Sequence, residues 1–190
     1  MINIFSNLLI LFLLCLLFTE QSYGQGILIN EFMPDNKTSI QDEDDDNSDW
    51  IEIYNSNDYP VNLLNYSISD NKGDYQKWIF PDVTILPKSY LVIFASGKNR
   101  YNPLELHTNF KISSEGEQVF LSNNLGMIID QTEIIVLEED EVYERFPDGS
   151  SDWIKSINHS PRSANIANNQ LIFSSNEGFY SSAFYLIIES

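Results

Sequence analysis

The chain has 190 residues, with ten Lys and Arg against 28 Asp and Glu and a formal net charge of -18 at pH 7. Such a chain repels nucleic-acid phosphate and anionic lipid headgroups, so we expect no nucleic acid among its partners. The charge favours metal cations and basic partners, although solubility is its simplest role. The length fits one domain, or one domain with a short second piece.

The first feature in the chain is an apolar run over residues 8–18, followed by mostly small and polar residues up to Gly24. A run of about eleven residues is too short to span a bilayer, which needs roughly 20. The pattern is typical of a secretory signal peptide, and we predict one over residues 1–24. It predicts a secreted or cell-surface protein, periplasmic or extracellular, with no transmembrane segment in the mature chain. No Lys or Arg precedes the run, which leaves a retained anchoring segment as the alternative.

The only cysteine, Cys15, lies inside this apolar run. Leu13 and Leu14 precede it, whereas a lipoprotein signal needs small residues there. If the signal is removed, the mature chain has no disulfide and must rely on a hydrophobic core. The remaining length is sufficient to bury such a core.

Short apolar segments separated by turn residues follow, and they predict strands. The segments are residues 27–33, 50–55, 61–69, 76–80, 83–85, 90–95, 118–122, 127–130, 132–136, 142–146 and 152–155. After residue 24, apolar residues nowhere recur at helical spacing. The chain is therefore predicted to be an all-β domain, an antiparallel sandwich or barrel.

The strand at residues 50–55 is predicted to organise the rest. Ile51 and Ile53 alternate with Trp50, Glu52 and Tyr54, which predicts one buried face. Residues 90–95 are apolar throughout, which is typical of a central strand covered on both faces. Residues 97–108 are predicted to be a polar loop. Residues 158–169 are predicted to be irregular chain leaving the domain.

An ordered set of these pieces resembles the lamin tail domain family. The pieces are residues 29–34, 49–55, 61–63, 66–70, 77–81, 90–95, 145–149 with Trp153, and 160–165. At Arg162 the family usually has Gly. The motif residues carried by the resemblance are Asn30, Glu31, Trp50, Glu52, Tyr54, Asn55, Trp78, Pro81, Asp148, Gly149 and Trp153.

The resemblance implies an immunoglobulin-like antiparallel β-sandwich over residues 25–166. The chain has no coiled-coil rod and carries an export signal, so it is similar to the bacterial secreted branch of the family. After a linker at residues 167–170, residues 171–190 resemble the start of the small β-domain that ends chitobiase-type (β-hexosaminidase) glycosidases. Only about twenty residues of that second module are present, fewer than an independent β-domain needs.

The acidic residues 42–49 form a loop that is either solvated or a Ca²⁺ site. Carboxylates are the ligands that Ca²⁺ prefers, and Asp42, Asp44, Asp46 and Asp49 are the candidates. The spacing does not match an EF-hand loop. No cofactor is required by this interpretation, and Ca²⁺ is the one candidate.

Glu31 and Glu52 are predicted to have structural roles, because buried acids need partners. They are expected to pair with Lys77 or Arg145, or to cap backbone groups.

Other candidate residues point to binding rather than catalysis. Most Trp and Tyr side chains are expected to pack the core, whereas Tyr59 and Tyr101 lie in predicted loops and are the surface candidates for stacking on a sugar ring. His107 and His159 have no Cys or second His at ligand spacing, which argues against a Zn²⁺ site. No nucleophile elbow or phosphate-binding Gly loop is present in the sequence.

The sequence therefore predicts a non-catalytic extracellular or cell-surface module for adhesion or for binding a protein or glycan. The alternative is an N-terminal accessory segment of a larger secreted enzyme, either a hydrolase or a spore-coat-H-like kinase, with the catalytic domain beyond residue 190. A structural spacer is a third interpretation.

Overall fold

The computed structural model describes residues 26–166. The predicted signal peptide (1–24), linker (167–170) and second module (171–190) lie outside the described residues. Over residues 26–166 every regular element is a β-strand, as predicted. This part of the chain contains no helix long and apolar enough to cross a membrane.

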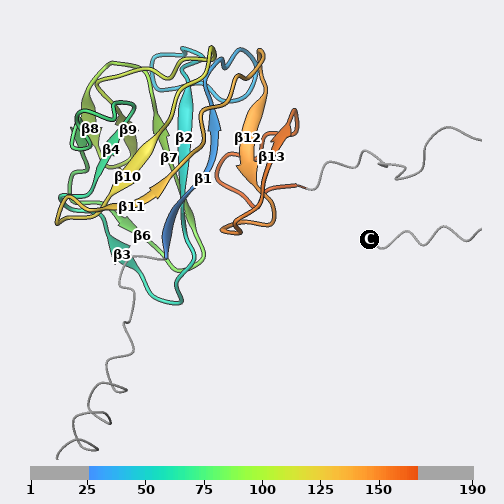
Figure 1. Ribbon diagram of the computed structural model, residues 1–190. Coiled ribbons are helices and arrows are strands. Elements are labelled where there is room, and N and C mark those ends of the chain that lie inside the picture. The colour runs from blue at the N-terminus through green and yellow to red at the C-terminus, as the bar shows by residue number, and fades with distance from the viewer. Residues whose placement is uncertain (1–25, 167–190) are drawn as a thin grey trace, which may run out of the picture.

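The strands form two main sheets and one small ribbon (Figure 1). A seven-stranded sheet has the order β13-β12-β1-β2-β7-β9-β8, a four-stranded sheet has the order β11-β10-β4-β5, and β3 pairs with β6. The bounds are β1 (Ile27–Met33), β2 (Trp50–Asn55), β3 (Val61–Asn62), β4 (Ser67–Ser69), β5 (Trp78–Ile79), β6 (Thr84–Ile85), β7 (Tyr90–Phe94), β8 (Arg100–Asn102), β9 (Glu105–His107), β10 (Phe120–Ser122), β11 (Ile128–Gln131), β12 (Val142–Arg145) and β13 (Trp153–Ser156).

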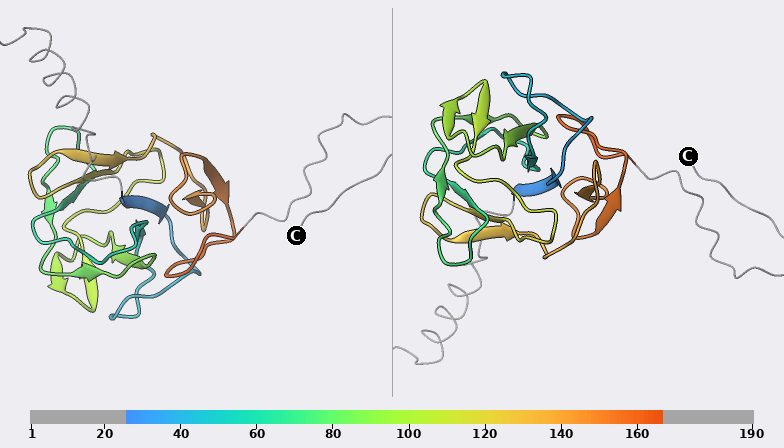
Figure 2. Two further views of the ribbon diagram at one scale, coloured as in Figure 1. Left: turned by 90° about the horizontal axis from the view of Figure 1, so that it is seen from below. Right: turned by 90° about the horizontal axis from the view of Figure 1, so that it is seen from above.

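The hydrophobic core lies between the two main sheets. Ile51 and Ile53 of β2 are fully buried in one cluster with Ile68, Trp78 and Leu121 of the four-stranded sheet. Views along the strands show β1 near the middle of the molecule with the later strands around it (Figure 2). The immunoglobulin-like sandwich is confirmed, and all strand pairs are antiparallel except β7 with β9.

Strand β2 is buried on both faces, so the prediction of a single buried face is wrong. Trp50 and Glu52 are as fully buried as Ile51 and Ile53. Trp50 belongs to a second cluster on the opposite side of the sheet, together with Met33, Val92, Phe94 and Val142, and Ile40 of the acidic-loop segment packs against it. Loops thus cover the outer face of the seven-stranded sheet, and polar–apolar alternation along one strand does not reveal such a cover.

A bulge in β1 sets which residues share that outer face. Ile29 pairs with Ile53, but Glu31 pairs with Glu52, so Asn30 is an extra residue on β1. An extra residue reverses the faces of the residues that follow it. Glu31 therefore lies beside Glu52 on the outer face, and Glu144 of β12 lies on its other side.

Several strand predictions need correction. Residues 61–69 divide into β3 and β4 of different sheets, because Leu63 to Tyr66 make a turn closed by a backbone hydrogen bond. Residues 132–136 are not a strand and make one isolated bridge, Glu117 with Ile135. The predicted loop at residues 97–108 contains the β8–β9 hairpin. Residues 160–165 do not leave the domain but pack on the outer face, where Ser160 and Asn165 are buried.

Candidate binding site

The acidic loop closes around one lysine. The Lys98 Nζ lies 2.7 Å from a carboxylate oxygen of Asp42 and 2.7 Å from one of Asp44. Asp46 contacts the same ammonium at 2.9 Å. The three carboxylates predicted as Ca²⁺ ligands thus come together, and each has an oxygen within 4.8 Å of the others. The centre of the group is taken by the Lys98 ammonium.

Asp42 is the buried member of this group and also orders the loop backbone. Its Oδ1 accepts hydrogen bonds from the N–H groups of Asp44 and Asp46, and its Oδ2 accepts one from the Ser48 hydroxyl. Burial alone would raise the pKa of Asp42, but hydrogen bonds from Lys98, Ser48 and the backbone outweigh it and lower the pKa to about 2. These hydrogen bonds fix the loop backbone around Asp42, whereas residues 43–47 are exposed, as expected for a solvated loop.

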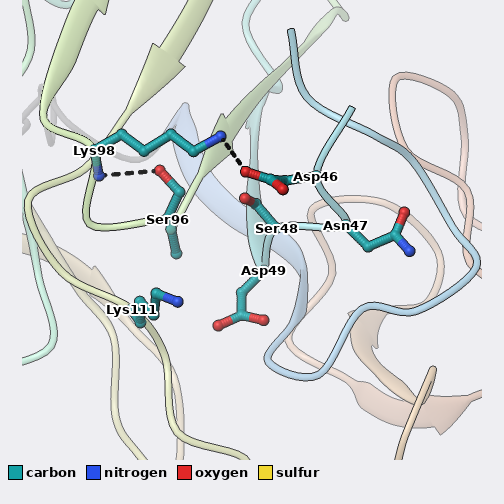
Figure 3. A pocket seen from close by; sticks show the side chains of 8 residues that line it. Asp46, Asn47, Ser48, Asp49, Ser96, Lys98 and Lys111 are labelled. Atoms are coloured by element: carbon teal, nitrogen blue, oxygen red, sulfur yellow. Dashed lines mark hydrogen bonds and ion pairs between the residues drawn. The ribbon is translucent and has the colours of Figure 1, made fainter. Parts of the chain in front are cut away.

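The fourth predicted ligand, Asp49, belongs to a neighbouring cavity instead. The cavity has a volume of about 290 Å³ and is lined by Asp46, Asn47, Ser48, Asp49, Ala95, Ser96, Lys98 and Lys111. Burial raises the pKa of Asp49 to about 6, and the positive charge of Lys111 partly opposes that shift. Figure 3 shows both residues beside one space, across which the Lys98 side chain reaches Asp46. Sequence reasoning missed Ser96, Lys98 and Lys111, since isolated residues in a polar stretch carry no spacing signal.

The calcium prediction can be tested by removing the lysine. Lys98→Met removes the cation that the three carboxylates share, and only Asp44 keeps another, Arg100. We therefore expect the variant to lower the free energy of unfolding by about 1–3 kcal/mol in EDTA. Thermal unfolding with EDTA and with CaCl₂ gives the measurement. If the loop binds Ca²⁺, the ion should raise the melting temperature of the variant, and chelation should lower that of the wild type. A wild-type protein unaffected by EDTA would rule out Ca²⁺ as a resident ion.

The two tyrosines predicted as surface candidates lie at opposite ends of the large sheet. Tyr59 is 56% exposed and follows the Asn55 end of β2, where its carbonyl accepts a hydrogen bond from Asn55. Tyr101 is 48% exposed and stacks on Trp78 with ring centroids 5.4 Å apart. The register of β8, β9, β7 and β2 places Tyr101 level with Ile51 across the sheet. Ile51 is near the end of β2 that follows the acidic loop. The pair cannot act as one stacking platform.

Glu31 and Glu52 hold residues 160–165 against the outer face of the seven-stranded sheet. Glu31 accepts hydrogen bonds from the N–H of Ser160 at 3.1 Å and from its hydroxyl at 3.5 Å. Glu52 accepts from the N–H of Arg162 at 2.5 Å. Of the predicted alternatives, capping of backbone groups is therefore what the structure shows. The expected basic partners bind other acids: Lys77 contacts Asp70, and Arg145 contacts Asp130.

Burial gives these acids unusual protonation properties. It raises the pKa of Glu31 to about 9, with a further increase from the Glu52 charge. It raises the pKa of Glu52 to about 8 and that of Glu144 to about 7. The nearby Ser156 hydroxyl partly opposes the rise for Glu144, although neither Glu144 oxygen has a hydrogen-bond partner of normal geometry within residues 26–166. Glu31 and Glu52 are therefore largely protonated at neutral pH, whereas Glu144 is about half protonated.

Asp148 connects the bulge at Asn30 to residues 160–165. It accepts hydrogen bonds from the Asn30 side chain and from the N–H of Asn165, both at 3.0 Å, and from the Tyr90 hydroxyl at 2.6 Å. Arg162, at the usual Gly position of the family, has a φ of 70°. Gly adopts that conformation at no steric cost, whereas Arg does not, which gives a physical reason for the family preference.

The other motif residues have structural positions. Trp50 and Trp78 are buried, and the Asn55 side chain donates to the carbonyls of Tyr59, Ile85 and Leu86. Tyr54 stacks on Tyr90, and Gly149 lies so close to Tyr54 that an added Cβ would be 3.3 Å from the ring. Trp153 stacks on Tyr143, and half-buried Pro81 lies between β5 and β6.

Comparison with known families agrees with the observed fold. No curated protein sequence matches the chain significantly. A model of the Lamin Tail Domain matches residues 20–135, which is more than half of the chain. This family is an immunoglobulin-like, non-catalytic one, in agreement with the observed sandwich. The match ends before Asp148, Gly149 and Trp153. On the ordered motifs, the sandwich and this match, the chain belongs to the lamin tail domain family.

Proposed function

We propose that this lamin tail domain protein is an extracellular or cell-surface binding module and that it holds a polar ligand in the cavity beside the acidic loop. The observation that supports the proposal is the cavity itself, about 290 Å³ in volume and lined by charges of both signs. Asp46 and Asp49 lie with Lys98 and Lys111, and Ala95 is the one apolar residue in the lining.

The charged lining favours a ligand with both donors and acceptors. A protein side chain or a glycan hydroxyl pair meets that requirement, whereas an apolar ligand does not. The walls are held before binding, because Lys98 ties the acidic loop to the segment after β7. A preformed site loses less conformational entropy when the ligand binds. The apolar N-terminal run supports an extracellular location.

The proposal is tested by comparing two lysine variants. The domain is labelled and applied to a glycan array and, separately, to a peptide array. We expect Lys111→Met to weaken binding at least tenfold, since Lys111 lines the cavity. Lys88→Met is the matched control, because Lys88 pairs with the exposed Asp58 outside the cavity. Equal binding by both variants, or no binding on either array, would contradict the proposal.

A further inference from the structure

The hairpin β8–β9 and the acidic loop bring one histidine and two glutamates together. An atom of His107, one of Glu105 and one of Glu43 all lie within 4.8 Å of one another. We propose that these three side chains bind a divalent transition metal, with Zn²⁺ as the best fit. The site is separate from the Asp42, Asp44 and Asp46 group, and it does not depend on the binding function proposed above.

His107 is already oriented as a metal ligand. Its imidazole is fully buried, and its ring stacks on Phe94 with centroids 5.3 Å apart. The Nδ1 lies 2.8 Å from the Ser96 hydroxyl, and the Nε2 lies 3.1 Å from Glu105 Oε1. Metal-binding histidines are characteristically held in this way, with one ring nitrogen on a second polar group and the other aimed at the metal.

The spacing of the donor atoms suits a small cation. Metal–ligand bonds of about 2.0–2.2 Å place two neighbouring ligand atoms roughly 3 Å apart. The 3.1 Å between His107 Nε2 and Glu105 Oε1 agrees with that value. Glu43 is held beside them, because its backbone N–H donates to the same Glu105 oxygen at 2.5 Å. The two glutamates are 62 positions apart in sequence and meet only in the fold.

Glu43 is the ligand that must turn to reach the metal. Its carboxylate now contacts Arg100 at 2.6 Å, and both side chains are 39% exposed. Exposed ion pairs contribute little to stability, so a metal can replace Arg100 at small cost. Arg100 keeps its contact with Asp44 when Glu43 is withdrawn.

The types of donor atom account for the choice of metal. Metal binding needs the lone pair of Nε2. In the metal-bound protein the ring proton would therefore reside on Nδ1, where the Ser96 oxygen can accept it, and a proton between Nε2 and Glu105 would be released. An imidazole with two carboxylates suits Zn²⁺ and similar ions, whereas Ca²⁺ prefers ligands that are all oxygen. Three protein ligands leave at least one position for water or a partner's carboxylate.

The test follows both histidine rings during metal titration of the wild-type domain. ZnCl₂ is added while ¹⁵N NMR records the ring nitrogens. We expect the Nε2 signal of His107 to shift and saturate at one equivalent. His159, the other of the two histidines, bonds Ser39 and provides an internal control. Because this measurement needs no variant, it remains decisive if substitutions at the buried site impair folding.

Calorimetry on variants then assigns the ligands. We expect His107→Gln and Glu105→Gln to weaken Zn²⁺ binding about 100-fold, and Ser96→Ala to weaken it about 10–100-fold by releasing the ring. Ser96→Thr should restore binding, because it keeps the hydroxyl. Asp58→Asn changes an exposed acid that pairs with Lys88 and should leave the affinity unchanged. An unshifted His107 ring, or undiminished Zn²⁺ binding in His107→Gln, would overturn the proposal.

Discussion

Raising the pH from 5 to 9 is expected to lower the free energy of unfolding of the domain by at least about 3 kcal/mol. The cause is the row of Glu31, Glu52 and Glu144 on the outer face, whose pKa values are raised to about 9, 8 and 7, mainly by burial. In the unfolded chain these groups titrate near 4.5. Between that value and the folded pKa, the folded state holds more protons, so the contribution of these three groups to stability is fully present below pH 4.5 and is lost as the pH rises.

At low pH the dependence of stability on pH has the opposite sign, so stability falls as the pH falls. The pKa of Asp42 is lowered to about 2, so its contribution is present above its ordinary value of 3.8 and is lost as the pH falls toward 2. The two effects together place the maximum stability between about pH 4 and 5. Many proteins are most stable closer to neutrality, so this optimum is a distinctive result.

Urea denaturation across this pH range tests the explanation. Glu31→Gln retains an oxygen for the Ser160 N–H but cannot ionise, so we expect a shallower loss of stability above pH 5 and a variant more stable than the wild type at pH 8. Glu52→Gln should act in the same direction. Glu115→Gln changes an exposed acid and should leave the pH profile unaltered. A wild-type urea midpoint equal at pH 5 and pH 9 would contradict the explanation.

Ile51→Ala is expected to lower the free energy of unfolding by about 2–5 kcal/mol. Ile51 is fully buried and lies between Phe32 of β1 and Ile93 of β7, both in the same core cluster. Removing its outer carbons leaves a cavity that neighbours on two strands cannot fill without distorting the sheet.

The control for this prediction is Leu104→Ala in the same chain. Leu104 is 91% exposed in the β8–β9 turn, so we expect a change within about 0.5 kcal/mol. Both variants are compared by urea denaturation at pH 5, with the m-value checked for a constant unfolded state. A loss below about 1 kcal/mol for Ile51→Ala would mean that the face of β2 assigned to the core is wrong.

The local residue pattern predicts a strand correctly where strand preference is strong and turn residues bound the run. The apolar runs at residues 27–33 and 90–95 closely match β1 and β7, because the preference for strand was strong and turn residues bounded each run. The pattern failed at residues 132–136, where the β-branched side chains lack a full partner strand and Ile134 is exposed. It also failed at residues 97–108, because the charged hairpin β8–β9 gains its pairing from β7.

The candidate sites depended on contacts that the sequence does not encode locally. Spacing suggested that several acids of residues 42–49 could converge, and Asp42, Asp44 and Asp46 do so. It could not show that Lys98, more than fifty positions away, supplies the central cation. The lack of a second histidine at ligand spacing argues against a metal site at His107, yet the fold brings Glu43 beside His107 and its β9 neighbour Glu105.

The sequence by itself determined the all-β class, the lamin tail family and the burial of Ile51 and Ile53, since strand periodicity and ordered motifs are local properties of the chain. Only the tertiary structure decided which face of each strand is covered and which charges meet. One extra residue at Asn30 reverses the faces along β1, and segments distant in sequence return to cover Glu31 and Glu52. The reason is physical: burial and charge pairing depend on distances in space, which residue spacing does not fix.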